Sequence, residues 1–149
     1  MLDPTELTFF WTTPRQIRYQ DELELRFRVL REPLGMTREQ VTFPFEDESL
    51  HLLAVQNHQV VGCVLFHPQG PHSGRLFQMA VEPALQGQGL GAALVHHLED
   101  ELRRRGVHEI HLHAREVACG FYSKLGYSVR GAPFTEVGIE HYEMVKQIS

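Results

Sequence analysis

The sequence predicts an α/β fold with a central sheet that is at least partly parallel, and two observations carry this prediction. Segments with the periodicity of strands and of helices alternate through the second half of the chain, which is the order of a sheet with parallel strands. The 149 residues, of which 42% are hydrophobic and 22% charged, match a soluble chain long enough to bury a core. Since no repeat or linker divides the chain, we expect one domain over residues 1–149.

A first strand and a first helix are predicted in the N-terminal quarter of the chain. β-Branched and aromatic residues mark residues 6–11 as a strand. Thr13 has the character of an N-cap, and Gln16 stands where it would complete a capping box, so the helix is expected to begin there. Pro33 and Gly35 are expected to end it.

Leucine periodicity predicts the longest helix, and apolar runs bounded by turn residues predict the other strands. The helix begins at Leu90 and ends at Gly106, with Glu99 on its solvent face four residues before an arginine. A shorter helix is expected over residues 117–125. The predicted strands are residues 50–56, 60–67, 75–81, 107–114, 127–130 and 139–146. The first two of them are joined by a short turn at residues 57–59.

Net charge and hydropathy exclude several classes of protein. The chain has 14 Lys+Arg against 19 Asp+Glu, a formal charge of -5, and lacks the basic excess that neutralises nucleic-acid phosphates. No apolar run approaches the ~20 residues of a membrane-spanning helix. Residues 1–6 lack the basic and apolar regions of a secretory signal. We therefore expect a cytoplasmic protein with neither a nucleic-acid nor a membrane partner.

The cysteines and histidines give no pattern of a metal site. Cys63 and Cys119 lie in separate apolar runs, as buried reduced thiols do, and no CxxC pair exists. The ten histidines include neither a His-x-x-x-His helical pair nor an HExxH motif. We expect no metal cofactor.

A glycine-rich turn separates a predicted strand from the start of the longest helix. Gly87, Gly89 and Gly91 remove side chains where the free backbone N–H groups of a helix start could bind a phosphate or pyrophosphate. The spacing is G-x-G-x-G, not the G-x-G-x-x-G of a dinucleotide site, and the lysine of a Walker A loop is lacking. A tight turn that only allows close packing of helix and sheet is the structural alternative.

Two motifs in order resemble the GNAT superfamily of acyltransferases. The first is residues 79–83, Met-Ala-Val-Glu-Pro, followed by Gln86-x-x-Gly89-x-Gly91. The second is Ala118-x-x-Phe121-Tyr122-x-x-x-Gly126-Tyr127. The resemblance covers residues 75–130 directly. It implies a GNAT fold, a three-layer arrangement with a mixed sheet of about six to seven strands flanked by about four helices.

The resemblance also implies acetyl-CoA as co-substrate. The pyrophosphate would bind the backbone amides of the glycine turn. Pantetheine would pair with the edge of the strand at residues 79–81, which splays from the neighbouring strand at residues 108–114. Arg115 stands where many family members have asparagine, so that role does not carry over directly. The expected CoA-binding residues are Met79, Ala80, Val81, Gln86, Gly87, Gln88, Gly89, Leu90, Gly91, Ala92, Arg115, Phe121 and Tyr122.

Tyr122 matches the family tyrosine that protonates the departing thiolate, and it is the expected general acid. The general base stays open, because Gln78 stands where some members have a carboxylate. The candidates are Glu46, Asp47, Glu48, Glu82, Glu136 and His141, and we place the last two in the catalytic set. The acidic run at 46–48 is either a cation-attracting surface or a solvated turn. Resemblance at the two chain ends suggests that Arg28, Arg31, Glu136 and His141 meet at the acceptor site.

The predicted function is therefore that of an acetyl-CoA-dependent N-acetyltransferase. It would transfer an acetyl group to a primary amine of a small molecule or peptide by direct attack in a ternary complex. The negative net charge suits an amine acceptor. A non-catalytic acyl-CoA sensor with the same fold is the alternative, and the oligomeric state is open between monomer and homodimer.

Overall fold

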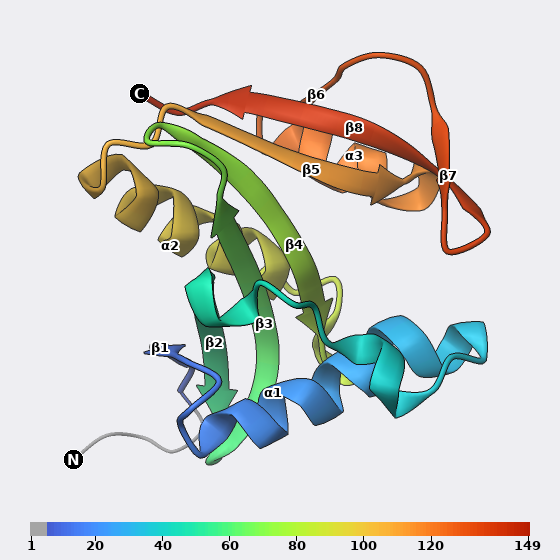
Figure 1. Cartoon of the computed structure of the whole chain (residues 1–149). Helices are drawn as coiled ribbons and strands as arrows, with labels where there is room; N and C mark the ends of the chain where they lie inside the picture. Colours follow the sequence, from blue (N-terminus) through green and yellow to red (C-terminus); the bar gives the residue numbers. More distant parts are fainter. Residues whose placement is uncertain (1–5) are drawn as a thin grey trace.

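Eight strands form one mixed sheet in the computed structural model, which describes residues 6–149 (Figure 1). The strands are β1 (Thr8–Thr12), β2 (Leu50–Gln56), β3 (Gln59–Pro68), β4 (Ser73–Val81), β5 (Glu109–Arg115), β6 (Ser128–Val129), β7 (Phe134–Glu136) and β8 (Ile139–Gln147). Their order is β1-β2-β3-β4-β5-β8-β6, and β7 pairs with β8 beside this path. The predicted mixed sheet is confirmed. It has one strand more than expected, the short β7, and the strand predicted over residues 127–130 is reduced to the two residues of β6. The expectation about a secretory signal rests largely on residues 1–5, which lie outside the described part of the chain.

Helices cover both faces of this sheet and make the three layers. They are α1 (Arg18–Arg26), the π-helical η1 (Phe27–Arg31), the 3-10 turns η2 (Glu32–Leu34), η3 (Arg38–Val41), η4 (Glu46–Glu48) and η5 (Pro83–Leu85), α2 (Leu90–Arg104) and α3 (Glu116–Lys124). One core cluster lies between the sheet and α2 with α3, and a second lies under α1. Within residues 6–149 no helix is both long enough and apolar enough to cross a membrane.

The first helix begins later than the sequence predicts. Thr13 and Gln16 form a turn, in which the Gln16 amide donates to the Thr13 carbonyl at 3.0 Å, and α1 starts at Arg18. The Gln16 side chain bonds to the Thr12 hydroxyl, so the predicted capping box is wrong. Gly35 does end the helical segment, in the left-handed conformation with φ 71°. The turn between β2 and β3 has two residues, Asn57 and His58, rather than the three expected, and both have positive φ as a type I′ turn requires.

β4 and β5 are the parallel neighbours at the centre of the sheet, and they separate after a short stretch. Only three residue pairs join them, and the last is Arg75 with His111. Beyond that pair the two strands diverge, as Figure 1 shows. A β-bulge in β4 accompanies the separation: the register with β3 shifts, and Gln78 takes a left-handed φ of 52°. The two halves of the sheet therefore enclose a wedge-shaped gap.

The buried face of α1 is charged, which the apolar periodicity of the sequence did not indicate. Arg26 has no exposed surface and donates to Glu22 at 2.8 Å and to both oxygens of Glu46 at 2.8 and 2.7 Å. The Tyr19 hydroxyl donates to Glu46 at 2.7 Å. His51 of β2 has its two ring nitrogens 2.9 Å from a Glu22 oxygen and from the Glu46 carbonyl oxygen. Burial of these charges is tolerated because each one has an opposite charge and several hydrogen bonds.

Two further sequence expectations are wrong in detail. Glu99 is buried and does not lie on the solvent face of α2. Its carboxylate accepts hydrogen bonds from the Tyr127 hydroxyl at 2.8 Å and from Lys146 Nζ at 3.0 Å. Cys63 is fully buried as expected, whereas Cys119 is only half-buried. The leucines of α2 are buried as predicted and form much of the larger core cluster.

We predict that Arg26→Met destabilises the protein by about 3–5 kcal/mol, because it removes the guanidinium that pairs with the buried carboxylates of Glu22 and Glu46. Arg28→Met is the matched control. Arg28 pairs with Glu82 at the surface, and we expect a change within about 1 kcal/mol. Urea unfolding of both variants measures the difference. Equal destabilisation of the two variants would contradict this account of the buried ions.

The stability is also predicted to depend on pH through His51. Burial would lower the pKa of His51, but the hydrogen bond and charge of Glu22 outweigh it, and the pKa is raised. A raised pKa in the folded state gives stability that is fully present below the unfolded value near ~6.5 and is lost as the pH rises through the folded value. The free energy of unfolding should therefore fall over this range.

The comparison variant for this pH series is His51→Gln, which should have a flatter profile than the natural protein. His96→Gln, on the exposed surface of α2, should keep the natural slope. Chemical denaturation at closely spaced pH values gives all three profiles. An unchanged slope in His51→Gln would show that this imidazole is not the titrating group.

Candidate functional site

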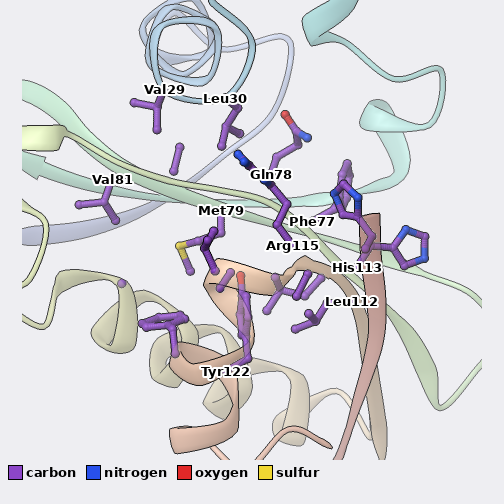
Figure 2. A pocket seen from close by; sticks show the side chains of 18 of the residues that line it. Val29, Leu30, Phe77, Gln78, Met79, Val81, Leu112, His113, Arg115 and Tyr122 are labelled. Carbon is purple, nitrogen blue, oxygen red and sulfur yellow. The ribbon is translucent and has the colours of Figure 1, made fainter. Parts of the chain in front are cut away.

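The gap between β4 and β5 is a cleft of about 930 Å³. Its walls come from η1, β4, β5, α3 and the turn before α2 (Figure 2). The narrow end lies at Arg75, where the strands still pair, and the wide end lies at the glycine turn. Val81 and His113 lie on opposite sides of the view in Figure 2.

Each strand presents one backbone edge to this cleft. On the sides away from the cleft, β4 pairs with β3 and β5 pairs with β8. On the sides that face each other, residues 76–81 of β4 do not pair with residues 112–115 of β5. A strand edge with free N–H and C=O groups can pair with an extended chain that carries amides. The cleft can therefore bind a ligand with peptide-like groups along β4.

The glycine turn holds the start of α2 open toward the cleft. Gly87 and Gly89 have φ of 79° and 85°, a conformation that other residues adopt only with strain. A Cβ on Gly91 would lie 3.1 Å from the Phe121 ring, so α2 and α3 approach closely there. The Gln86 side chain donates to the Val81 carbonyl at 3.0 Å and fixes the turn to the end of β4. The N–H groups of the first turn of α2 are thus presented to an anion.

Tyr122 projects from α3 into the cleft, as Figure 2 shows. Its ring is buried and packs edge-on against Phe121 and Tyr127. Within residues 6–149 its hydroxyl makes no hydrogen bond, and burial raises its pKa well above the usual range. Tyr122 therefore keeps its proton at neutral pH and can donate it to a group in the cleft.

Charged and imidazole side chains gather at the narrow end of the cleft around Glu136 of β7. The Glu136 carboxylate lies 3.0 Å from His113 Nδ1, 3.7 Å from His141 Nε2 and 3.7 Å from Arg75 Nη2. Arg31 lines the same cleft from η1. Arg28, which we expected to join them, instead makes a bidentate surface pair with Glu82, and that expectation is wrong.

Most of the site residues predicted from sequence line the cleft. They are Met79, Ala80, Val81, Gln86, Gly87, Gly89, Gly91, Ala92, Arg115, Phe121, Tyr122, Glu136 and His141. Gln88 and Leu90 do not line the cleft with their side chains. Gln88 is exposed and donates to the Ala84 carbonyl, and the Leu90 side chain belongs to the core. Glu46 is neither a solvated residue nor a surface for cations, since it is buried against Arg26.

No role in the cleft was predicted from the sequence for Arg75 or His113, and the anchoring of Gln78 was not predicted either. The Arg26 Nε donates to the Gln78 side-chain oxygen at 3.3 Å, so the buried ions reach the cleft through this amide. Arg75 could have been noticed in the sequence, because it is a charged residue at the start of a largely apolar predicted strand. The anchoring of Gln78 had none, because Arg26 lies 52 positions away along the chain.

One group of potential metal ligands occurs in the described residues, and it consists of Glu22, Glu46 and His51. The oxygens and nitrogens of these side chains already bond to Arg26, to Tyr19 or to one another. The guanidinium of Arg26 thus supplies the positive charge that a cation would bring. We explain this group as an ion network and assign no metal to it.

A mixed sheet that splits between two parallel strands, beside a glycine turn that opens a helix, defines the acyl-CoA N-acyltransferase class of folds. Within this class, the chain belongs to the acetyltransferase (GNAT) family, whose sequence model matches residues 12–127. This membership supports acyl transfer from an acyl-CoA as the general chemistry.

Individual relatives agree with this family. The uncharacterized protein YyaT of Bacillus subtilis strain 168 is 33% identical over 104 residues, which are 70% of each chain. The uncharacterized N-acetyltransferase YitI of the same strain is 28% identical over 141 residues, 90% of this chain and 95% of that one. An aminoglycoside 6'-N-acetyltransferase solved in complex with coenzyme A has a TM-score of 0.78 at 22% identity, with 95% of this chain and 97% of that chain covered. At that identity the likeness shows the fold alone.

Proposed function

We propose that the protein is an acetyl-CoA-dependent N-acetyltransferase that acts on a primary amine of a small molecule or peptide. The observation that carries the proposal is the unbonded hydroxyl of Tyr122 in a cleft bordered by the free edge of β4. The family match and the coenzyme A in the aminoglycoside acetyltransferase support the choice of co-substrate.

Acetyl-CoA would lie along β4, with its pyrophosphate at the glycine turn. The backbone amides of residues 86–92 supply donors to the phosphate oxygens, and the positive end of the α2 dipole favours them. The two amides of pantetheine pair with the free backbone groups of Met79 to Val81. This arrangement directs the thioester toward the bulge at Gln78 and toward Tyr122.

The reaction is a direct attack of the amine nitrogen on the thioester carbonyl carbon. A C–N bond forms, the C–S bond breaks, and the proton of the Tyr122 hydroxyl goes to the departing thiolate. The proton lost by the amine goes to a second group of the cleft, which acts as the general base. Glu136 and His141 both line the cleft and lie 3.7 Å apart, so this pair is our proposed base.

We predict that Tyr122→Phe lowers kcat by about 10²-fold or more, because general acid catalysis typically contributes that much. The dissociation constant for acetyl-CoA should change by less than about twofold, since only a hydroxyl is removed. Thiol release measured against a panel of polyamines, aminoglycosides, amino acids and peptides identifies an acceptor for this assay. Tyr142→Phe, whose hydroxyl bonds to Glu140 outside the cleft, is the matched control and should keep full activity.

The alternative of a non-catalytic acyl-CoA sensor makes the opposite prediction. A sensor binds acetyl-CoA but releases no thiol with any amine of the panel. That result would overturn the proposal. An acceptor-dependent turnover that survives Tyr122→Phe undiminished would instead remove Tyr122 from the mechanism.

A further inference from the structure

Two half-buried arginines at the narrow end of the cleft each have a buried Nε that lacks a hydrogen-bond partner. The Arg31 side chain makes no hydrogen bond and no ion pair within residues 6–149, and its Nε is buried without a partner. Arg75 Nε is also buried without a partner, and its Nη2 comes no nearer than 3.7 Å to Glu136. Buried donors are rarely left unsatisfied, because each costs free energy. The described fold does not account for these two buried Nε donors.

The charges at this end of the cleft do not balance. Within residues 6–149, Glu136 is the carboxylate whose charge acts on both Arg31 and Arg75, and the positive charge of Arg26 also acts on Arg31. The guanidiniums of Arg31 and Arg75 thus share the single carboxylate of Glu136. Burial lowers the pKa of both arginines, and the charge of Glu136 only partly opposes it. A single negative charge on a ligand would make this region neutral.

The position of the pair separates it from the glycine turn. Arg75 stands at the last residue pair between β4 and β5, six positions before Val81. At about 3.3 Å per residue this is roughly 20 Å along the strand. The two ends of the cleft therefore face different parts of the bound molecules.

We infer that Arg31 and Arg75 bind a carboxylate of the acceptor, and that the acceptor is an amino acid or a short peptide with a free carboxylate. The inference deepens the proposed transferase function and rests on it. A guanidinium donates two parallel hydrogen bonds to a carboxylate, which fixes the orientation of the acceptor amine in the cleft. Polyamines and aminoglycosides would instead bring positive charge beside two guanidiniums, and the cleft disfavours them.

Matched acceptor pairs test the inference by turnover. Each amino acid of a panel is compared with its own amide, which keeps the amine and the side chain but removes the negative charge. We expect kcat/KM to be about tenfold or more higher for the acid, mainly through a lower KM. Amides that react as well as the acids would overturn the inference.

Arg31→Gln is the decisive variant, because the Arg31 side chain makes no hydrogen bond or ion pair within residues 6–149 that the substitution could break. It should raise KM for the acid at least about tenfold and leave the amide unchanged, so that the preference disappears. Arg75→Gln should act in the same direction, with thermal unfolding as a check that it folds. Arg28→Gln, outside the cleft, is the matched control and should keep the preference. Equal losses for acid and amide in Arg31→Gln would contradict a role in carboxylate binding.

A binding measurement separates this inference from the transferase proposal. With CoA present, N-acetyl amino acids and their amides are titrated into the protein, and no turnover is needed. Tighter binding of the acids, lost in Arg31→Gln, supports the carboxylate site even if no acceptor is acetylated, in which case only the transferase proposal fails. Equal binding of acids and amides overturns the carboxylate site.

The phosphates of CoA are the other possible source of negative charge. The affinities of Arg31→Gln and Arg75→Gln for CoA and for dephospho-CoA distinguish a CoA phosphate from the acceptor carboxylate as the group that these arginines bind. We expect both affinities to stay within about twofold of those of the natural protein. A tenfold loss of CoA affinity in these variants, with the acid preference retained, would assign the arginines to CoA and overturn the inference.

Discussion

The separation of β4 from β5 after three residue pairs is the constraint on which the rest of the structure depends. Parallel neighbours in a sheet normally stay paired, because unpaired backbone groups lose hydrogen bonds. Here the bulge at Gln78 turns β4 away, and water or a ligand must satisfy the free edge. The cleft, the exposure of the glycine turn and the access to Tyr122 all follow from this single departure from a regular sheet.

The buried ions under α1 hold the bulge of β4 in place through a hydrogen bond to Gln78. Arg26 is held by Glu22 and Glu46, and it donates in turn to the side chain of Gln78 at the bulge. Gln78, which has a left-handed φ, is thus tied to a fully buried charge. A bulge anchored in this way keeps its shape whether or not the cleft is occupied, and a preorganised site loses little free energy on binding.

The sequence predicts the elements that local patterns determine. The leucines of α2, the glycine turn and the order of strands and helices along the chain appear as expected, because periodicity and turn chemistry act over few residues. The charged face of α1 and the burial of Glu46 and Glu99 were not predicted, since each depends on a partner many positions away. Net charge also says little about the local field: the whole chain carries -5, yet Arg31 and Arg75 both line the cleft beside the single carboxylate of Glu136.

The most direct test of the central claim is backbone hydrogen exchange with and without acetyl-CoA. If the free edge of β4 receives the ligand, exchange should slow in residues 79–81 and in the glycine turn at residues 86–92. Peptides from β2, away from the cleft, should exchange at an unchanged rate. Binding of acetyl-CoA detected by calorimetry without slower exchange in residues 79–81 would contradict the claim that the separated strand is the binding surface.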